Sequence, residues 1–297
     1  MPGLSELLPR LERALGPLGG APEPLSGGIT NRNYRAELGG RDCVIRLPGH
    51  DTQLLGIDRE SERLAAERAA ALDIGPPLLY ADGDCAVTAF VPGTPADPRR
   101  LRADPAQLAR ALRAFHDSGL ALPARFWVPD LLRVYAEVVR RRGGRLPAAY
   151  GRAVALVDRI ARALPLLDPV PCHDDLLPGN VIDLDGRLLL VDWEYAGLGH
   201  RYFDLGNLAV NNGFDAEAEA RLLEAYLGQP AALGQLAALR LFRLASDARE
   251  AAWGVVQAQI SKIDFDFTAY ADEHFERLER AALDRRELEE LLHAATP

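Results

Sequence analysis

Apolar residues in the first ninety positions follow two spacings, one typical of helices and one typical of strands. Leucines recur every three or four residues near the start, which predicts an amphipathic helix. Short alternating segments follow, and one pair flanks Gly39-Gly40, the signature of a hairpin. The expected elements, in chain order, are helix 3–16, strands 33–38 and 42–47, helix 58–72, and strands 78–80 and 85–91.

The segment Pro92-Gly93-Thr94-Pro95 interrupts this pattern, and we place a lobe boundary there, between residues 1–91 and 92–297. Helical spacing dominates beyond it. The pattern therefore predicts an α+β protein, with a small β-rich lobe followed by a larger, mainly helical lobe. The expected elements of the second lobe are a helix around 108–115, helices 129–142 and 147–164, a hairpin of strands 181–182 and 188–191 around Asp185-Gly186, and helices from 203 onward.

The overall charge narrows the range of partners. The 297 residues include 43 acidic and 34 basic side chains, a formal net charge of −9. This charge argues against nucleic acid as the main partner and suits a small cation. No apolar run approaches the roughly 18 residues of a membrane span, and residues 1–16 lack the apolar core of a signal peptide. We expect a cytoplasmic protein without a membrane span. The sequence gives no indication of the oligomeric state.

Counts of single residue types exclude several kinds of site. The three cysteines are far apart and form no CxxC pair, which argues against a disulfide framework and a thiolate zinc site. Lys262 is the only lysine and follows Ser261, so a Walker A loop, which needs Gly-Lys, is excluded. HExxH and GxSxG are also absent.

Candidate chemistry is concentrated between residues 171 and 194. Asp175 and Asn180 are close enough in sequence to share one tight loop, and the following hairpin brings Asp192 back toward them. A carboxylate can orient or deprotonate an attacking hydroxyl. An amide oxygen and a second carboxylate are hard ligands of the type that hold Mg²⁺ beside phosphate oxygens. This spacing matches the arrangement used for kinase-type phosphoryl transfer.

Three motifs carry a family resemblance: His173-Asp-Asp-Leu-Leu-Pro-Gly-Asn180, Asp192-Trp-Glu-Tyr195 and Phe203-Asp-Leu-Gly-Asn207. Together they resemble the bacterial choline kinase branch of the choline/ethanolamine kinase family, within the aminoglycoside phosphotransferase superfamily. The likeness extends from about residue 25 to residue 281. Its further segments are Gly27-Gly-Ile-Thr-Asn-Arg-Asn-Tyr34, Val44-Ile-Arg-Leu-Pro-Gly49, Trp253-Gly-Val-Val-Gln257 and Asp264-Phe-Asp-Phe-Thr-Ala-Tyr270.

This resemblance implies a protein-kinase-like bilobal fold, with ATP and Mg²⁺ as cofactors and a small cationic alcohol as phosphate acceptor. It makes Asp175 the catalytic base, in contact with the acceptor, and Asn180 and Asp192 the metal ligands. His173 and Asp204 are expected to brace the catalytic loop through hydrogen bonds.

Nucleotide-binding roles follow for the first lobe. Arg46 takes the strand position where many kinases keep a lysine, and the absence of lysine before residue 262 agrees with this assignment. Its expected partner is Glu62, which the helix spacing favours over Glu60. The other nucleotide-binding residues that the resemblance implies are Gly27, Gly28, Thr30 and Asn31 in a phosphate loop, and Phe90 and Val91 in a hinge.

A quaternary ammonium group cannot donate a hydrogen bond, so aromatic faces and carboxylates are expected to bind it. Trp253 and Tyr270 match the family's cation-binding aromatics. The other candidates near the acceptor are Trp193, Tyr195, Glu194, Asp264 and Asp266. Eukaryotic members of the family have Glu-Trp where this chain has Asn211-Asn212, and a second tryptophan at Val256. Asn211 is therefore a candidate acceptor contact that differs from the family's residue, and we expect fewer aromatic residues around the ammonium group.

The predicted function is therefore phosphorylation of choline or a related amino alcohol such as ethanolamine. The alternative with the same core is an aminoglycoside or thiamine phosphotransferase, because core motifs alone do not fix the acceptor. A third alternative is a nucleotide-binding scaffold without catalysis, against which the intact Asp175, Asn180 and Asp192 argue.

Overall fold

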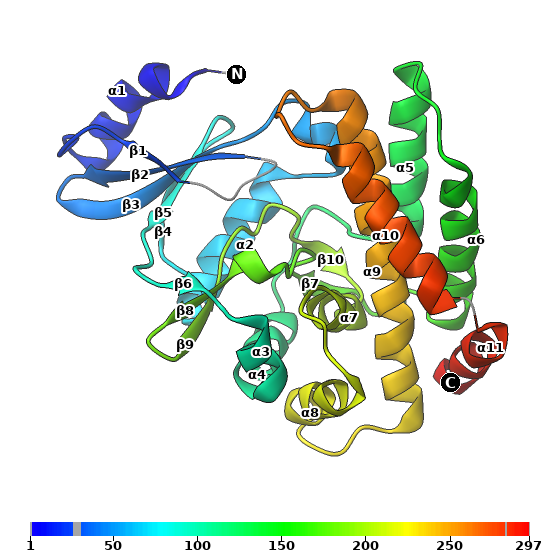
Figure 1. Ribbon diagram of the computed structural model, residues 1–297. Helices are drawn as coiled ribbons and strands as arrows, with labels where there is room; N and C mark the ends of the chain where they lie inside the picture. Colours follow the sequence, from blue (N-terminus) through cyan, green and yellow to red (C-terminus); the bar gives the residue numbers. More distant parts are fainter. Residues whose placement is uncertain (1, 26–30, 283, 297) are drawn as a thin grey trace.

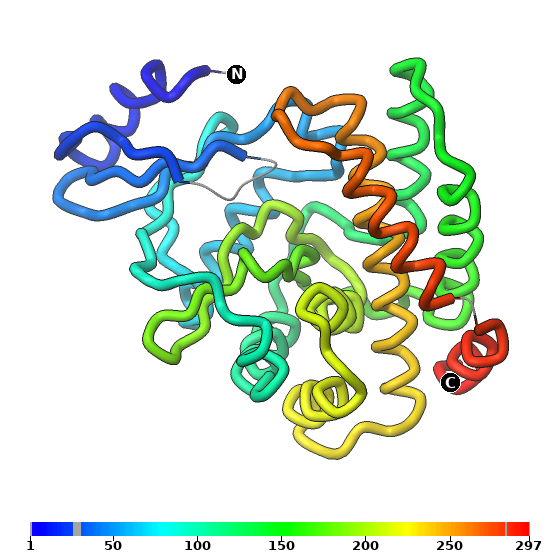
Figure 2. The backbone as a smooth tube through the Cα atoms, in the orientation of Figure 1, coloured from blue at the N-terminus to red at the C-terminus, as the bar shows by residue number. Residues whose placement is uncertain are grey.

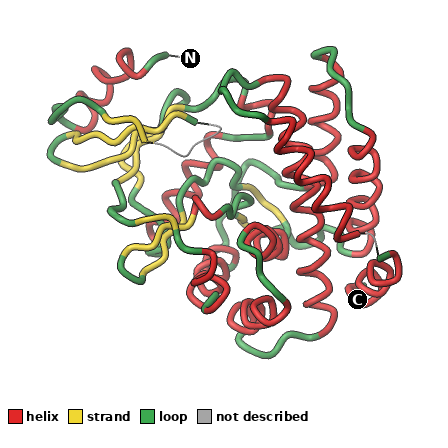
Figure 3. Tube along the Cα trace, in the orientation of Figure 1, coloured by secondary structure: helices red, strands yellow, loops and turns green. Residues whose placement is uncertain are grey.

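A computed structural model describes residues 2–25, 31–282 and 284–296. Strands are gathered at one end of the molecule and long helices at the other (Figures 1 and 3). The elements of the first part are α1 (Leu4–Leu15), β1 (Glu23–Leu25), β2 (Arg32–Leu38), β3 (Arg41–Leu47), the 3-10 helix η1 (Thr52–Leu55), α2 (Arg59–Ala71), β4 (Leu78–Ala81) and β5 (Ala86–Ala89).

The first part is built on an antiparallel five-stranded sheet in the order β1-β2-β3-β5-β4. The β2–β3 hairpin turns at Gly39 and Gly40, whose φ angles of 59° and 74° favour glycine. Alternate residues of β3 (Cys43, Ile45 and Leu47) are buried. They share an apolar core with the leucines of α1, so one face of the sheet is covered.

The second part begins with a short strand and is mainly helical. Its elements are β6 (Thr94–Pro95), α3 (Pro98–Ala103), α4 (Ala106–His116), α5 (Val128–Arg141), α6 (Ala148–Ala163), β7 (Val170–Cys172), the 3-10 helix η2 (Pro178–Asn180), β8 (Val181–Leu184), β9 (Arg187–Leu190), β10 (Gly197–Gly199), α7 (Arg201–Asn211), α8 (Ala216–Leu227), α9 (Leu233–Ile260), α10 (Phe267–Ala282) and α11 (Arg285–Ala295).

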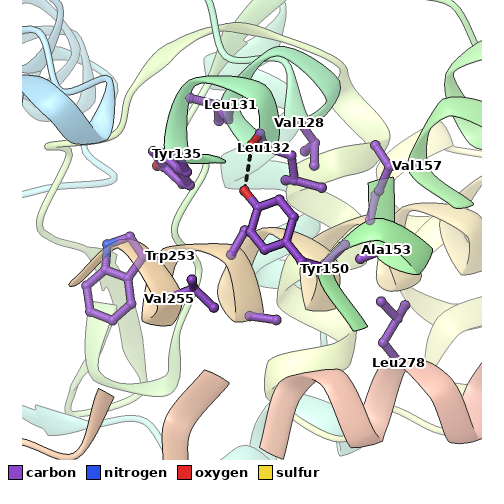
Figure 4. Close-up of a cluster of buried hydrophobic side chains, with 14 of the residues drawn as sticks. Val128, Leu131, Leu132, Tyr135, Tyr150, Ala153, Val157, Trp253, Val255 and Leu278 are labelled. Carbon is purple, nitrogen blue, oxygen red and sulfur yellow. Dashed lines mark hydrogen bonds between the residues drawn. The ribbon is translucent and has the colours of Figure 1, made fainter. Parts of the chain in front are cut away.

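The 28-residue helix α9 forms the axis of the helical part, with α10 lying along it (Figures 1 and 2). It also packs against α5, α6 and α7. Close approach to α7 depends on Gly206, because a Cβ there would lie 2.7 Å from the backbone carbon of Phe242. Figure 4 shows part of the resulting core, where the Tyr150 hydroxyl donates to the Leu132 carbonyl and Trp253 lies on the α9 side.

Two small sheets belong to the second part, and one of them packs against helix α2 of the first part. Strands β7 and β10 pair with each other, and β6, β8 and β9 form a three-stranded sheet. Helix α2 contributes Ala65 and Ala69 to the same apolar core as Leu190 and Trp193 of the second part. A backbone hydrogen bond of 2.7 Å from Leu190 to Ile74 adds to this contact. The residues around Asp192 are therefore fixed to both parts of the molecule.

The predicted α+β architecture, with a small sheet part and a larger helical part, is confirmed. The strand expected over 85–91 is shorter and spans Ala86–Ala89; beyond it the Val91 carbonyl accepts the backbone N–H of Gly93 at 2.8 Å, so the chain turns there. Strands β1, β6, β7 and β10 were not predicted, since two or three residues are too few to show a period. Over the described ranges, every helix is too short or too polar to cross a bilayer.

Candidate active site

A loop between β7 and η2 carries the central carboxylates of the site. Asp204, at the start of α7, accepts the backbone N–H groups of His173 and Asp174 at 2.8 Å each. His116 adds a third contact to Asp204, at 3.0 Å. Burial alone would raise the pKa of Asp204, but these hydrogen bonds lower it. An ionised carboxylate beneath the loop therefore holds its backbone in place.

His173 braces the loop in the way the sequence led us to expect. Its Nε2 lies 3.0 Å from the Val191 carbonyl, and its Nδ1 accepts the backbone N–H of Asp175 at 3.3 Å. Burial lowers the pKa of His173 and keeps the imidazole neutral, so that Nδ1 can accept. Trp193 packs against the same ring, at 4.4 Å between ring centres.

Asp175 has partners on both sides of its carboxylate. Asn180 donates to its Oδ2 at 3.1 Å and to its backbone carbonyl at 2.8 Å. Arg249, from α9, donates to its Oδ1 at 3.2 Å. Burial raises the pKa of Asp175, and the positive charge of Arg249 opposes that rise. The carboxylate is therefore fixed in orientation by an amide on one side and a guanidinium on the other.

Asn180 and Asp192 offer the donor atoms that a magnesium ion needs. The Nδ2 group of Asn180 is turned toward Asp175, which leaves its Oδ1 available on the opposite side. Asp192 follows β9 at a left-handed φ of 64° and lines the same cavity as Asn180. A backbone hydrogen bond of 3.0 Å from Val191 to Asn180 keeps the two segments adjacent. Two hard oxygen ligands beside an open cavity fit Mg²⁺.

Arg46 lies at the centre of a buried ionic cluster. It forms the expected ion pair with Glu62 of α2, whereas Glu60 pairs with Arg63 instead. Its Nη1 also contacts Asp192 at 3.0 Å. The side chain thus links the sheet, helix α2 and the segment after β9, where its permanent charge can meet phosphate.

A cavity of about 360 Å³ opens between the two parts and is lined by the sheet on one side and by Asn180 and Asp192 on the other. Its size suits a small ligand. Phe90 and Val91 line it, as expected for the hinge, but the Phe90 N–H donates to the Asp42 carbonyl. Asn31 accepts the Gly49 N–H at 3.4 Å. The expected phosphate-loop residues Gly27, Gly28 and Thr30 lie outside the described residues.

Aromatic side chains gather on the other side of Asp175. The Trp253 indole N–H donates to the Tyr195 hydroxyl at 2.7 Å, and the rings of Trp253 and Tyr270 meet edge to face at 5.5 Å. The Tyr270 hydroxyl donates to Glu250 at 2.8 Å. The structure therefore brings together the two aromatic residues predicted for the acceptor, with a carboxylate beside them.

Three expectations for the acceptor side need correction. Asp264 and Asp266 are exposed, because they lie in the turn before α10, where Asp266 caps Ala269. Glu194, in the loop after β9, is buried and faces two cations of the first part, 3.3 Å from Arg46 and 3.7 Å from Arg59. The carboxylate beside the aromatics is Glu250 instead.

Asn211 and Asp174 differ in how their side chains are accommodated. Asn211 ends α7, and its Oδ1 accepts from Arg277 at 3.3 Å, so that this oxygen is engaged within the protein. Asp174, which precedes Asp175 in the same loop, is fully buried and has a left-handed φ of 66°.

Arg249 and Glu250 are the site residues that the sequence reasoning missed. Both are 1% exposed although they are charged, and they lie in the alanine-rich middle of α9. Their position four and three residues before Trp253 was the available signal, because side chains at those spacings are neighbours on one face of a helix.

Comparison with known proteins agrees with this geometry. A family model described as the phosphotransferase enzyme family matches residues 22–242. The chain belongs to the phosphotransferase enzyme family. Mouse ethanolamine kinase 2 is 32% identical over 281 residues, which cover 82% of this chain and 71% of that protein. The protein LicA of Haemophilus influenzae is 27% identical over 215 residues, or 68% of this chain and 62% of that protein.

Solved structures place this phosphotransferase family member near the choline/ethanolamine kinases. A Mesorhizobium loti protein of that group is 30% identical, with a TM-score of 0.81 and 98% coverage of both chains. A spectinomycin phosphotransferase, at 15% identity and a TM-score of 0.57, shares the fold alone. The predicted family, fold and enzyme class, a phosphotransferase acting on an alcohol, are confirmed. The family match ends before Arg249, so it includes Asp175 but not the aromatic side.

Proposed function

We propose that this phosphotransferase is an ATP- and Mg²⁺-dependent kinase that phosphorylates the hydroxyl of choline or a related amino alcohol such as ethanolamine. One observation carries the proposal: the Asp175 carboxylate is held by Asn180 toward the cavity and by Arg249 toward the aromatic residues. A group between two such regions can act on an acceptor bound in one of them and a nucleotide bound in the other.

Residues 1–91 would hold the nucleotide and residues 92–297 the catalytic loop and the acceptor. In this assignment Arg46 contacts phosphate, and Glu62 orients the Arg46 side chain. Asn180 and Asp192 would hold Mg²⁺, which would neutralise part of the negative charge of the phosphates. The nearness of a solved LicA structure in complex with AMP, at 23% identity, is a likeness of fold and is compatible with nucleotide binding in this cavity.

The chemical step needs a base at the acceptor hydroxyl. The hydroxyl oxygen forms a bond to the γ-phosphorus, the bond from that phosphorus to the ADP oxygen breaks, and the hydroxyl proton passes to Asp175. Asp175 serves this role only when ionised. Burial raises the pKa of Asp175 to about 8, and the adjacent positive charge of Arg249 offsets only part of that rise, so the ionised form gains as the pH increases toward that value.

The acceptor assignment rests on the aromatic side. Trp253 and Tyr270 supply ring faces, and Glu250 supplies a carboxylate within 2.8 Å of the Tyr270 hydroxyl. Ring faces with a nearby carboxylate bind an organic ammonium group. The relation to an ethanolamine kinase at 32% identity supports an amino alcohol as substrate.

A direct test compares ATP consumption with choline, ethanolamine, 3,3-dimethylbutanol, thiamine and kanamycin. We expect turnover with choline or ethanolamine, and a clear preference for choline over its uncharged isostere 3,3-dimethylbutanol. A Trp253→Ala variant should weaken use of the amino alcohol by roughly thirtyfold, since a desolvated cation–π contact contributes about 2 kcal/mol. Turnover with kanamycin or thiamine alone would contradict the assignment of an amino alcohol as acceptor, while leaving the phosphotransferase activity supported.

A further inference from the structure

Arg249 lies in the region where the proposed acceptor would bind. It is 1% exposed, and its Nη1 is 3.2 Å from Asp175 Oδ1 and 2.7 Å from Glu250 Oε1. Its guanidinium carbon lies 4.2 Å from the centre of the Tyr195 ring and 5.9 Å from that of Phe126. The chain thus places one of its own cations between two carboxylates and an aromatic face.

Those surroundings have the chemistry of a site for an organic cation. Aromatic faces and carboxylates attract a delocalised or quaternary cation, and the attraction is strongest where water is excluded. Burial alone would lower the pKa of Arg249, but the charges of Glu250 and Asp175 raise it well above its ordinary value. The guanidinium is therefore charged at every physiological pH.

The guanidinium is only partly satisfied by hydrogen bonds. Within the described part of the chain, its Nε and Nη2 have no acceptor, although both atoms are buried. Unpaired buried donors destabilise this placement. The two carboxylates, which accept hydrogen bonds from Nη1, and the Tyr195 face are the interactions that offset this cost.

We propose that Arg249 is a specificity-determining residue, an inference that rests on the proposed function. Its guanidinium is a cation of the protein itself that occupies the Tyr195 face and neutralises part of the carboxylate charge available to an acceptor. An acceptor's ammonium group is then left with the Trp253 and Tyr270 faces and with the Glu250 oxygen that Tyr270 contacts. The preference for charged over uncharged acceptors is correspondingly smaller than the aromatic residues and carboxylates would give without Arg249.

The test removes the charge while keeping the length of the side chain. Arg249→Met should bind tetramethylammonium at least about tenfold more tightly than the wild type, measured by titration calorimetry, because a repelling charge within the site is gone. Arg249→Lys keeps the charge and should bind tetramethylammonium like the wild type. Arg249→Gln, which can still hydrogen bond to Asp175 and Glu250, should behave like Arg249→Met and serves if the methionine variant does not fold.

The matched control is Arg240→Met, on the same helix. Arg240 pairs with Glu219 at 2.9 Å, away from the aromatic residues, and its loss changes the net charge of the protein equally. It should leave tetramethylammonium affinity unchanged. Equal tightening in Arg240→Met, equal tightening in Arg249→Lys, or no tightening in both Arg249→Met and Arg249→Gln would overturn the proposal.

A kinetic comparison separates this inference from the proposed function. The ratio of kcat/KM for choline to that for 3,3-dimethylbutanol should rise at least about tenfold in Arg249→Met, even if kcat falls for both. An unchanged ratio would contradict the role of Arg249. If the wild type phosphorylates neither choline nor ethanolamine, the proposed function fails, while the calorimetric comparison still decides whether Arg249 fills a cation site.

Discussion

Two neighbouring aspartates of the catalytic loop have opposite surroundings. Asp175 is held by Asn180 and Arg249, whereas both carboxylate oxygens of Asp174 are buried without a hydrogen-bond partner among the described residues. Burial, reinforced by the nearby charge of Asp204, raises the pKa of Asp174 well above its ordinary value. Burial therefore favours the neutral form of Asp174, next to the residue that the proposed reaction requires in its charged form.

This difference predicts a pH-dependent gain in stability from Asp174→Asn. The unfolded chain releases the Asp174 proton near pH 4, so the wild type loses stability as the pH rises from there toward the raised pKa of the folded state, by about 1.4 kcal/mol for each pKa unit. The amide cannot ionise and avoids this loss. Thermal unfolding should give similar melting temperatures below pH 4 and a higher one for Asp174→Asn at pH 7. A variant less stable than the wild type at pH 7 would show that Asp174 is ionised when folded.

At the scale of secondary-structure elements, strand β3 and helix α2 are joined through one ion pair. β3 alternates buried apolar residues with Arg46. Helix α2 begins at Arg59, after an N-cap at Asp58, and Glu62 is buried in its first turn. The link between Arg46 and Glu62 fixes the position of α2 relative to the sheet and directs a cation toward the cavity.

The ATP requirement should therefore depend on Arg46. Arg46→Ala is expected to raise the KM for ATP by roughly tenfold or more, because a charge-assisted phosphate contact is lost. Arg46→Lys should raise the KM for ATP less than Arg46→Ala does, because the lysine keeps a positive point charge but lacks the planar fork of the guanidinium. Arg41→Ala, on the same strand but bonded to the Leu15 carbonyl, serves as the control in steady-state kinetics. If the KM for ATP is unchanged in Arg46→Ala, Arg46 does not contact the nucleotide.

At the scale of the whole molecule, the site is assembled from segments far apart in sequence. The family resemblance, with helix spacing to choose between Glu60 and Glu62, predicted the pairing of Arg46 with Glu62. Local spacing predicted the β8–β9 hairpin that returns Asp192 and the helices around it. It could not place Arg249 beside Asp175, 74 residues away, because that contact depends on how α9 packs against α7 and α10.

The acceptor side shows the same limit of sequence reasoning. Trp253 and Tyr270 were found through their motifs, but Glu250 was overlooked because it lies in an alanine-rich helix segment. Asp264 and Asp266 carry the same charge in a more visible motif, yet they are exposed. Composition shows which charges exist, whereas tertiary packing decides which of them face the substrate.

The central claim is that Asp175 accepts the proton of the acceptor hydroxyl, and the most direct measurement compares turnover with nucleotide affinity in Asp175→Asn. Turnover with the preferred amino alcohol should fall at least about a hundredfold, while the affinity for Mg–ATP stays close to that of the wild type. Asp185→Asn, in the β8–β9 turn, is the matched control and should change neither quantity. Near-normal turnover in Asp175→Asn, with a folded protein, would contradict the account.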